Sequence, residues 1–360
     1  MTDESLREEI LVNVTPSEVR AALLENGLLQ EVHVERDACR GVISNIYKGR
    51  ATRVLPGMQA AFVEIGLDRT AFLHVSDIVR PVNGDDPDRE LPGIRELVRE
   101  GDDLLVQVVK DPIGNKGARL TTFITLPARH LVLLPKGDGV GVSARIEDED
   151  ERERLRVMAE ELLAEFGLEC GAIVRTVAEG VDAEPLRADI KFLLKLWTVV
   201  QERCSQAAVK SLIHEDLPLQ MRVLRDLVSS DVERILVDSG ADFEAMEEFA
   251  KTYLPEVAPK LERYQRRRPI FDMHGIEEDI RRALERSIPL KSGGYCIFDQ
   301  TEAMTTIDVN TGGYVGHRNL EETIYRTNLE AAVAIARQLR LRNLCGIIII
   351  VFIDMEEEGH

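Results

Sequence analysis

The stretch TTIDVNTGG, residues 305–313, carries polar side chains whose types and spacing could do chemistry. Side chains alternate across a β-strand, so Thr306, Asp308 and Asn310 share one face if this stretch is a strand. A carboxylate with an amide oxygen two residues further on suits Mg²⁺, which binds one or two carboxylates and keeps several waters. Two other interpretations stay open: Asp308 caps the glycine turn that follows, or the NTGG segment is a phosphate-binding loop.

A second carboxylate for such a site is expected from the run GIIIIVFIDM, residues 346–355. The run is apolar enough to predict a strand buried on both faces. A helical pattern over residues 319–343 separates it from the TTIDVN strand, and this order predicts a parallel βαβ unit. The two strands then end at the same edge of the sheet. Val351 lies in the region where the second acid is expected, and Asp354 points to the opposite face from Val351, so it is no automatic substitute.

Residues 40–125 contain five short strand-like runs separated by glycines, which predicts a small β-barrel of the OB type. Phe62 and Phe72 lie on neighbouring runs, and Lys110 and Lys116 lie near the fourth and fifth. Aromatic rings and lysines on one barrel face suit single-stranded nucleic acid, because bases stack on the rings and phosphates pair with the ammonium groups. The alternative is that both phenylalanines belong to the core.

Another pair of residues could bind phosphate. Arg175 and Thr176 follow a predicted strand, and a guanidinium fork with a hydroxyl suits a phosphate group. The alternative is that Arg175 makes an ordinary surface ion pair. Arginines at the end of the long helix and in the RRR run at residues 266–268 are expected to be solvated, since a helix C-terminus favours cations in any case.

The composition limits the class of protein. The chain has 360 residues, 44% hydrophobic and 30% charged, which is enough for two or three globular domains. It has no apolar run of transmembrane length, and its acidic N-terminus is not a signal peptide, so cytoplasm is the default compartment. Five cysteines without a CxxC pair predict neither disulfides nor a zinc site. The net charge of -19 disfavours a general nucleic-acid binder, although an average says little about a local groove.

Several local patterns predict further elements. Strands are expected at residues 9–14 and 28–35, with a turn or short helix at 16–27 between them. Another strand is expected at 220–227, and a helix over 276–290.

Taken together, long runs of the chain resemble the ribonuclease E/G family of bacterial endoribonucleases. The resemblance covers about residues 9 to 355, and two of its stretches, VLPGMQAAFVEIGLD and YVGHRNLEETI, look more like the ribonuclease G branch. The runs that carry it are NIYKGRATRVLPGMQAAFVEIGLDRTAFLHVSDI, GNKGARLTTFITLPARHLVLLP, IVRTVAEG, SGGYCIFDQTEAMTTIDVNTGGYVGHRNLEETIYRTNLEA and IARQLRLRNLCGIIII.

The resemblance implies an α+β multidomain architecture. An RNase H-like subdomain, without RNase H activity, would combine residues 1–39 and 218–283. An S1 domain, which is an OB-fold barrel, would be inserted at 40–125, followed by a 5′-sensor at 126–217. A partial DNase I-like catalytic subdomain would cover residues 284–360.

The resemblance also implies a reaction and its residues. The reaction would be Mg²⁺-assisted hydrolysis of A/U-rich single-stranded RNA, in rRNA processing and mRNA decay, leaving a 5′-phosphate and a 3′-hydroxyl. The implied site residues are Asp308 as catalytic metal ligand, Asn310 beside it, Phe62, Phe72, Lys110 and Lys116 for RNA, and Arg175 and Thr176 for a 5′-monophosphate.

Three departures from the family pattern matter. The family reads Asp-Phe-Ile-Asp-Met where residues 351–355 of this chain read Val-Phe-Ile-Asp-Met. Val351 thus replaces the family's second metal-binding aspartate, and a rate loss of roughly 10³ or more is expected. The family's homodimer and cysteine-pair zinc link depend on later segments, and the chain ends at His360. We therefore expect no zinc link and no dimerisation through those segments. One of two adjacent sensor arginines is Ala144, with Arg145 retained. A non-catalytic RNA-binding protein is therefore the alternative function.

Overall fold

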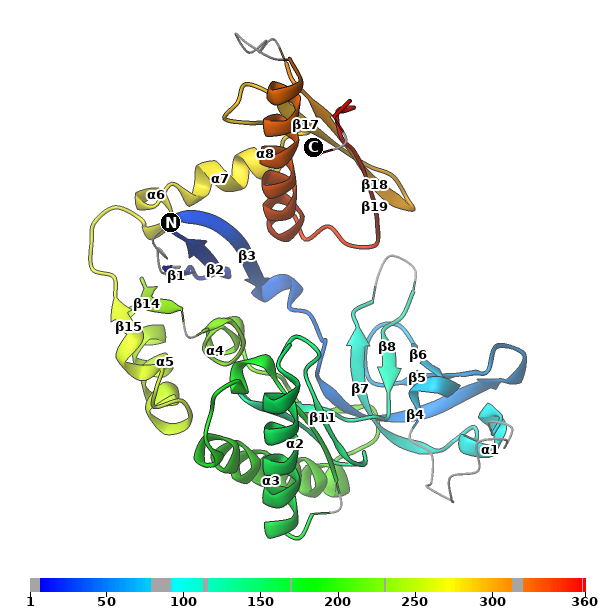
Figure 1. Cartoon of the computed structure of the whole chain (residues 1–360). Coiled ribbons are helices and arrows are strands. Elements are labelled where there is room, and N and C mark those ends of the chain that lie inside the picture. The colour runs from blue at the N-terminus through cyan, green and yellow to red at the C-terminus, as the bar shows by residue number, and fades with distance from the viewer. Residues whose placement is uncertain are drawn as a thin grey trace. The chain divides into compact units, whose positions relative to one another are not determined.

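The computed structural model describes residues 7–78, 92–112, 116–168, 170–229, 231–312, 320–357 and 359–360. The chain forms two compact units (Figure 1). Unit 1 combines Met1–Asp37 with Leu227–His360, and unit 2 is Ala38–Asp226. Among the described residues, no helix has both the length and the apolar character needed to cross a bilayer.

Unit 1 contains a five-stranded sheet in the order β15-β14-β1-β2-β3. β1 pairs in parallel with β14 and antiparallel with β2, so strands more than 200 residues apart in the sequence share one sheet. Its core includes Leu11, Leu24 and Leu29, packed against Phe271 of a short helix. The strands are β1 (Glu8–Val14), β2 (Glu18–Glu25), β3 (Leu28–Arg36), β14 (Val232–Val237) and β15 (Leu261–Arg263).

Residues 16–27 were expected to form a turn or a short helix, and the helix is wrong, because Glu18–Glu25 is strand β2. The strand is hydrogen-bonded on both sides, to β1 and β3, and Ala21 to Leu24 are buried. Tertiary pairing therefore overrides the helix preference of Ala, Leu and Glu. A tight turn at Asn26 and Gly27, both with positive φ (49° and 76°), joins β2 to β3. Asn-Gly between apolar runs is a strong hairpin signal and could have shown the strand.

A second sheet of unit 1 has the order β16-β17-β18-β19. β17 and β18 form an antiparallel hairpin, and β18 pairs in parallel with β19 across helix α8, as the predicted βαβ unit requires (Figure 1). Ile307 and Val309 pack against Ala331 and Ile335 of α8. The elements are β16 (Ser287–Pro289), β17 (Tyr295–Gln300), β18 (Met304–Asn310), α8 (Leu320–Leu341) and β19 (Ile347–Val351).

The prediction that the isoleucine run is buried on both faces is wrong. β19 is an edge strand, and Ile347 and Val351 are 60% and 54% exposed. Only one of its sides is hydrogen-bonded in the described structure, to β18. An apolar run alone cannot show whether a strand lies at the centre or at the edge of a sheet.

Among the described residues, unit 1 also contains the α-helices α5 (Gly240–Tyr253), α6 (Ile270–Met273) and α7 (Ile276–Ala283). The helix expected over residues 276–290 ends early, because β16 begins at Ser287 and pairs with β17.

The strand expected at 220–227 is also wrong: this segment is helical, with α4 (Leu219–Arg222) followed by a π-helical turn at Val223–Leu227.

Unit 2 contains the predicted OB-type barrel. Five strands follow the order β4-β5-β6-β8-β7, and pairing of β4 with β7 closes the barrel, while β13 extends β4. Ala61, Val63, Leu73 and Leu120 fill the interior. The elements are β4 (Ile46–Leu55), β5 (Ala60–Glu64), β6 (Ala71–His74), α1 (Ile94–Leu97), β7 (Asp103–Lys110), β8 (Arg119–Thr121) and β13 (Ser211–His214).

The rest of unit 2 is a small sheet with two long helices. The sheet has the order β11-β12-β10-β9, and its core joins Leu131 and Val174 to Leu155 and Leu193 of the helices. The elements are β9 (Leu126–Pro127), β10 (Leu131–Leu134), β11 (Val140–Val142), α2 (Glu149–Glu165), β12 (Gly171–Val174) and α3 (Ala183–Gln206).

Within unit 1, α8 contacts both β2 and β3 through charged side chains. The Arg340 guanidinium donates to Glu25 at 2.9 Å and to Glu31 at 3.0 Å. The hydrogen bond from His33 and the contact with Arg340 lower the pKa of Glu31 to about 2 from its ordinary value of 4.5, against the effect of burial.

We predict that Glu31→Gln destabilises unit 1 at neutral pH. Because the folded pKa is depressed, Glu31 contributes stability above pH 4.5, and that contribution is lost as the pH falls towards 2. After allowance for solvent screening, the loss should be about 1–2 kcal/mol near pH 7 and should vanish in acid. Urea unfolding as a function of pH measures it. Glu262→Gln, on the exposed edge strand β15, is the control, and equal effects of the two changes would contradict the assignment.

Candidate functional site

Five side chains form a stripe across the barrel of unit 2, one from each strand. Arg53 pairs with Phe62, Phe62 with Phe72, and Phe72 with Arg119. Arg119 pairs in turn with Lys110. Directly opposed residues on neighbouring strands lie side by side on one face. The barrel closure therefore brings together residues that are up to 66 positions apart in the sequence, counting from Arg53 to Arg119.

The stripe lies in a groove of about 1070 Å³. All four residues predicted for RNA binding line it: Phe62, Phe72, Lys110 and Lys116. The two phenylalanine rings meet edge to face, with centroids 6.1 Å apart and planes at 69°. Both rings are half-buried, whereas their strand neighbours Val63 and Leu73 fill the barrel interior. The alternative that both phenylalanines are core residues is therefore wrong.

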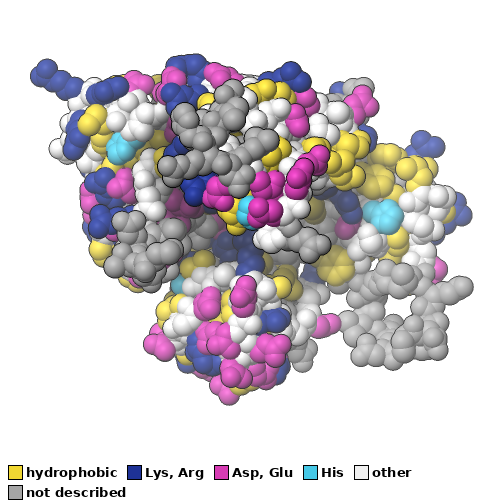
Figure 2. Space-filling view, turned by 45° about the horizontal axis from the view of Figure 1, so that its top comes forward, with side chains coloured by type: hydrophobic (Ala, Val, Ile, Leu, Met, Phe, Trp, Pro, Cys, Tyr) yellow, Lys and Arg dark blue, Asp and Glu magenta, His cyan; other side chains and the backbone are white. Residues whose placement is uncertain are grey.

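The groove is basic although the chain is acidic. Five basic and two acidic side chains line it, a local surplus of three positive charges against a net charge of -19 for the chain. Figure 2 shows basic and acidic side chains intermingled on the face in view. A cationic hollow with aromatic rings can hold a polyanion whose bases stack.

Sequence reasoning missed several members of this groove. Arg53, Met58, Arg69 and Arg119 also line it. Arg119 is held by Asp77, which accepts two hydrogen bonds from its guanidinium at 2.9 and 3.0 Å. Strict alternation along β4 would put Arg53 on the same side as the buried Ala51. A β-bulge between Ala51 and Arg53 turns Arg53 outward beside Phe62, and only the strand register shows this.

The imidazole of His74 extends the aromatic surface beyond the groove. Its ring centroid lies 6.4 Å from that of Phe72, with the planes only 29° apart. Its Nδ1 accepts the backbone N–H of Ser76, so the orientation of the ring is fixed by the turn that follows β6.

Asp308 lies on the exposed face of the second sheet in unit 1. Burial alternates along β18: Thr305, Ile307 and Val309 are buried, whereas Asp308 is exposed and Asn310 half-buried on the other face. The Asn310 amide Nδ2 donates to Asp308 Oδ2 at 2.8 Å. Within the described residues, the carboxylate thus contacts Asn310 rather than the backbone of Gly312, and Gly313 lies outside those residues.

The strand register places Val351 directly beside Asp308. In the parallel ladder, Thr306 pairs with Ile349 and Asp308 with Val351, while Ile297 of β17 flanks Asp308 on the other side. The carboxylate therefore stands between two apolar neighbours. Asp354 lies three residues beyond the end of β19. The backbone just before Asp354 is fixed, because Asn328 accepts from the Ile353 N–H at 3.1 Å and donates to its carbonyl at 2.8 Å.

The Asp308 carboxylate and the Asn310 amide oxygen suit Mg²⁺ as ligands, but they form only a minimal set. Asp308 supplies one exposed carboxylate, and the Asn310 carbonyl oxygen stands on the same face. Since Asn310 donates to Oδ2, the other carboxylate oxygen, Oδ1, can bind a cation. In the part of the chain that the structure describes, no cluster of three His, Cys, Asp or Glu residues could hold a metal. Mg²⁺ can bind through one carboxylate when substrate phosphates and waters complete its shell.

Arg175 and Thr176 lie at the end of β12, but the Arg175 guanidinium already has partners. Its Nη1 donates to the Ala128 carbonyl at 2.7 Å and to Asp226 at 2.8 Å. Burial alone would raise the pKa of Asp226, but hydrogen bonds from Arg225 and Arg175 hold that pKa below its usual value, so Asp226 is ionised at neutral pH. A phosphate at Arg175 must therefore compete with this carboxylate.

The hydroxyl of Thr176 lies 3.0 Å from that of Ser143. This contact places Thr176 next to the segment that holds Ala144 and Arg145, both exposed. The backbone N–H of Arg145 donates to the Ser143 hydroxyl at 3.4 Å.

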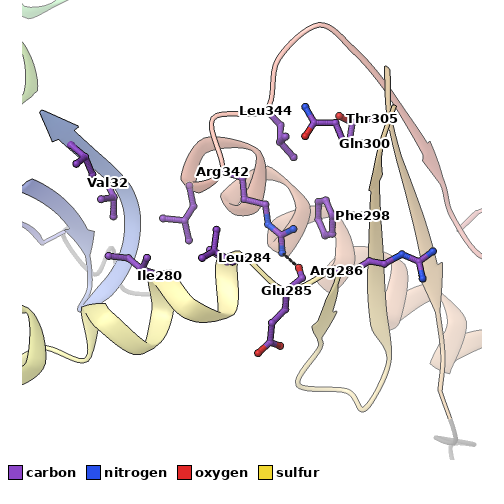
Figure 3. Close-up of a pocket in the computed structure, with 13 residues that line it drawn as sticks. Val32, Ile280, Leu284, Glu285, Arg286, Phe298, Gln300, Thr305, Arg342 and Leu344 are labelled. Atoms are coloured by element: carbon purple, nitrogen blue, oxygen red, sulfur yellow. Dashed lines mark hydrogen bonds between the residues drawn. The ribbon is translucent and has the colours of Figure 1, made fainter. Parts of the chain in front are cut away.

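A separate hollow of about 540 Å³ lies in unit 1, on the face of the sheet opposite Asp308. Figure 3 shows Val32 and Ile280 on one side of it and Phe298 with Arg342 on the other. The Arg342 guanidinium covers the Phe298 ring at 4.5 Å and donates to the Glu285 carbonyl at 2.8 Å. The Arg342 guanidinium is thus already engaged, and the hollow lies away from the exposed face of β18.

Known proteins match the chain along nearly its whole length. The model of the Ribonuclease E/G family matches residues 125–360. Ribonuclease G of Escherichia coli (strain K12) is 57% identical over 356 residues, which is 98% of this chain and 72% of that protein. The chain belongs to the ribonuclease E/G family. The family is one of endoribonucleases, so the resemblance read from the sequence is confirmed.

The identities differ between the two branches of the ribonuclease E/G family. Ribonuclease G of Haemophilus influenzae (strain ATCC 51907 / DSM 11121 / KW20 / Rd) is 54% identical over 98% of this chain and 72% of its own length. Ribonuclease E of Escherichia coli (strain K12) is 39% identical over 98% of this chain, but the match covers only 33% of that longer protein. The chain is thus closer to these ribonuclease G relatives than to this ribonuclease E.

We predict that Val351→Asp changes how unit 1 responds to Mg²⁺. Without the metal, two adjacent carboxylates should repel and lower stability by about 0.2–1 kcal/mol. With Mg²⁺ at roughly 100 times its dissociation constant, stability should rise by about 2.7 kcal/mol. Thermal melting with and without Mg²⁺ measures both effects. Ile349→Asp, on the same face but beside Thr306, is the matched control and should show no gain; an equal gain for both variants would rule out a site at Asp308.

Proposed function

We propose that this chain is a Mg²⁺-dependent endoribonuclease that cleaves single-stranded, A/U-rich RNA and senses a 5′-monophosphate. Membership of the ribonuclease E/G family supports the reaction class. The observation that carries the choice of single-stranded RNA is the stripe Arg53-Phe62-Phe72-Arg119-Lys110, because it offers stacking surfaces and cations in one row.

The exposed face of β18 would be the catalytic face. Asp308 and Asn310 would hold the metal, since they present the only carboxylate and amide of β18 on that face. When bound, Mg²⁺ would lower the pKa of its water and stabilise charge on the phosphoryl oxygens. The hydrogen bond from Asn310 keeps Asp308 in one orientation, so Oδ1 would be available to the metal without further rearrangement.

The other residues proposed for RNA would bind rather than react. Phe62 and Phe72 would stack bases, while Lys110 and Lys116 would pair with phosphates. Arg175 and Thr176 would bind the terminal phosphate, which requires Arg175 to exchange its contact with Asp226. A terminal phosphate is doubly charged near neutral pH, whereas Asp226 is singly charged, so the exchange is electrostatically reasonable.

The proposed subdomains follow from the same assignment. The mixed sheet of unit 1 supports an RNase H-like subdomain that combines residues 1–39 and 218–283, and the barrel supports an S1 domain at 40–125. The small sheet with α2 and α3 would be the 5′-sensor at 126–217, and the β16–β19 sheet would be part of a DNase I-like subdomain at 284–360.

A second candidate function is single-stranded RNA binding without cleavage. The position of Val351 beside Asp308 favours it, because a metal face with a single carboxylate loses charge and geometry. The loss is of the order of 4 kcal/mol, which corresponds to a rate about 10³-fold lower.

We predict that Phe62→Ala and Phe72→Ala each weaken binding of a short A/U-rich RNA by about 1–3 kcal/mol, roughly 5- to 150-fold, because each removes a stacking surface. Fluorescence anisotropy over a salt series measures the effect. Lys116→Ala should instead reduce the magnitude of the negative slope of log K against log[salt] by about 0.7. Phe123→Ala, an exposed phenylalanine of the same unit outside the groove, is the control; if it weakens binding as much, the groove is not the site.

We also predict that the chain cleaves a 5′-monophosphorylated A/U-rich oligonucleotide slowly, and only with Mg²⁺. Val351→Asp should raise the single-turnover rate by roughly 10³, since it returns a carboxylate beside Asp308. Asp308→Asn should abolish cleavage in both backgrounds. Binding that needs Phe62 and Phe72, with no product from either form, would decide for the non-catalytic function.

A further inference from the structure

A polar contact on the buried side of the β16–β19 sheet plays no part in the function proposed above. Glu330 of α8 reaches the turn between β16 and β17, residues 290–294. Its carboxylate accepts the backbone N–H of Lys291 and, at 2.9 Å, the backbone N–H of Ser292. The turn also closes on itself, because the Leu290 N–H donates to the Gly294 carbonyl at 2.8 Å. A charged acceptor with two N–H donors makes strong hydrogen bonds.

This turn is pressed against the proposed catalytic strand. A Cβ placed on Gly294 would lie 2.6 Å from the Asn310 carbonyl oxygen and 3.0 Å from a methyl carbon of Thr327. A Cβ on Gly312, where φ is +64°, would lie 2.5 Å from the Gly293 carbonyl oxygen. Only glycine allows backbones to approach so closely. A displacement of the turn would therefore move the backbone at Asn310 and Gly312.

Glu330 and Asp308 lie on opposite faces of the β16–β19 sheet. Cys296 of β17 is buried, and burial together with the charges of Glu330 and Asp308 raises the pKa of its thiol to about 11. Both carboxylates are thus near Cys296, although Asp308 is on the exposed face and α8 packs on the other. Glu330 does not share the exposed face with the reacting groups.

We propose that Glu330 is a positioning residue for the Asp308–Asn310 pair, which it fixes by clamping the turn at residues 290–294 against Asn310. The inference rests on the proposed function, because positioning matters only if this pair supports catalysis. A displacement of about 1 Å at such a pair can cost roughly 10²-fold in rate. RNA affinity should not change, since RNA binding is assigned to the barrel of unit 2.

The test compares Glu330→Ala, which removes both acceptors, with Glu330→Gln, which keeps one oxygen. Each is made in the unmodified chain and in the Val351→Asp form. We expect Glu330→Ala to lower the single-turnover cleavage rate by about 10- to 100-fold with an unchanged RNA dissociation constant, and Glu330→Gln to fall between. Amide hydrogen exchange at residues 304–312 should quicken in the same order. Glu322→Gln, which loses only an exposed pair with Arg326 on the same helix, should change neither quantity.

The outcomes separate this inference from the function on which it rests. If Asp308→Asn abolishes cleavage but Glu330→Ala, corrected for its folded fraction, cleaves normally, the positioning role is overturned and the function stands. A lower melting temperature with an unchanged rate and unchanged exchange at 304–312 also overturns it. If Asp308→Asn leaves cleavage unaltered, or if even the Val351→Asp form makes no product, the proposed catalytic pair is wrong and the role of Glu330 falls with it.

Discussion

The parallel pairing of β18 with β19 is the constraint on which the proposed chemistry depends. Parallel neighbours need a crossover connection, and α8 supplies it. The helix also sets the register, because Ala331 and Ile335 pack on Ile307 and Val309 and so commit alternate residues of β18 to the core. A slip of one residue would turn Asp308 into the core, so the packing of α8 fixes Asp308 on the exposed face and Val351 beside it.

The barrel of unit 2 has the role, in the proposed function, of holding a polyanion on an acidic protein. Its five strands are closed by pairing of β4 with β7, and this closure aligns Arg53, Phe62, Phe72, Arg119 and Lys110 in one row. Each aromatic ring then has an arginine as its neighbour across the strands. Because screening limits charge interactions to about 8–10 Å, the local surplus of positive charge counts for more at this groove than the net charge of the chain.

The sequence predicted the parts of this structure that depend on local pattern. The barrel, α8 and the parallel β18–β19 pair were all accessible from periodicity and turn residues. It failed where burial depends on distant partners. The Ala, Leu and Glu residues of β2 favour a helix, and nothing local marks β19 as an edge strand.

The same limit applies to the site residues. The types of Phe62, Phe72, Lys110 and Lys116 suggested a groove, and the structure brings them into one. Arg53 and Arg119 joined them only through strand register, which a single sequence does not reveal. Arg175 was predicted as a phosphate ligand or as a member of an ion pair; the described structure has the ion pair with Asp226, and a phosphate is not needed to explain its position.

The two halves of the proposed function depend on different parts of the protein and on different energies. In the proposed function, stacking and phosphate contacts in the barrel would hold bound RNA equally in the ground state and the transition state, so they would lower KM without raising kcat. Acceleration must come from groups that interact more strongly as charge develops on the phosphate, and the groups proposed for this lie on the Asp308 face. Since Val351 lies beside Asp308 and outside the barrel groove, its side chain would affect turnover and leave RNA binding in the groove unchanged. Tight RNA binding would therefore be no measure of activity, and one side chain beside Asp308 would separate a nuclease from an RNA-binding protein of the same fold.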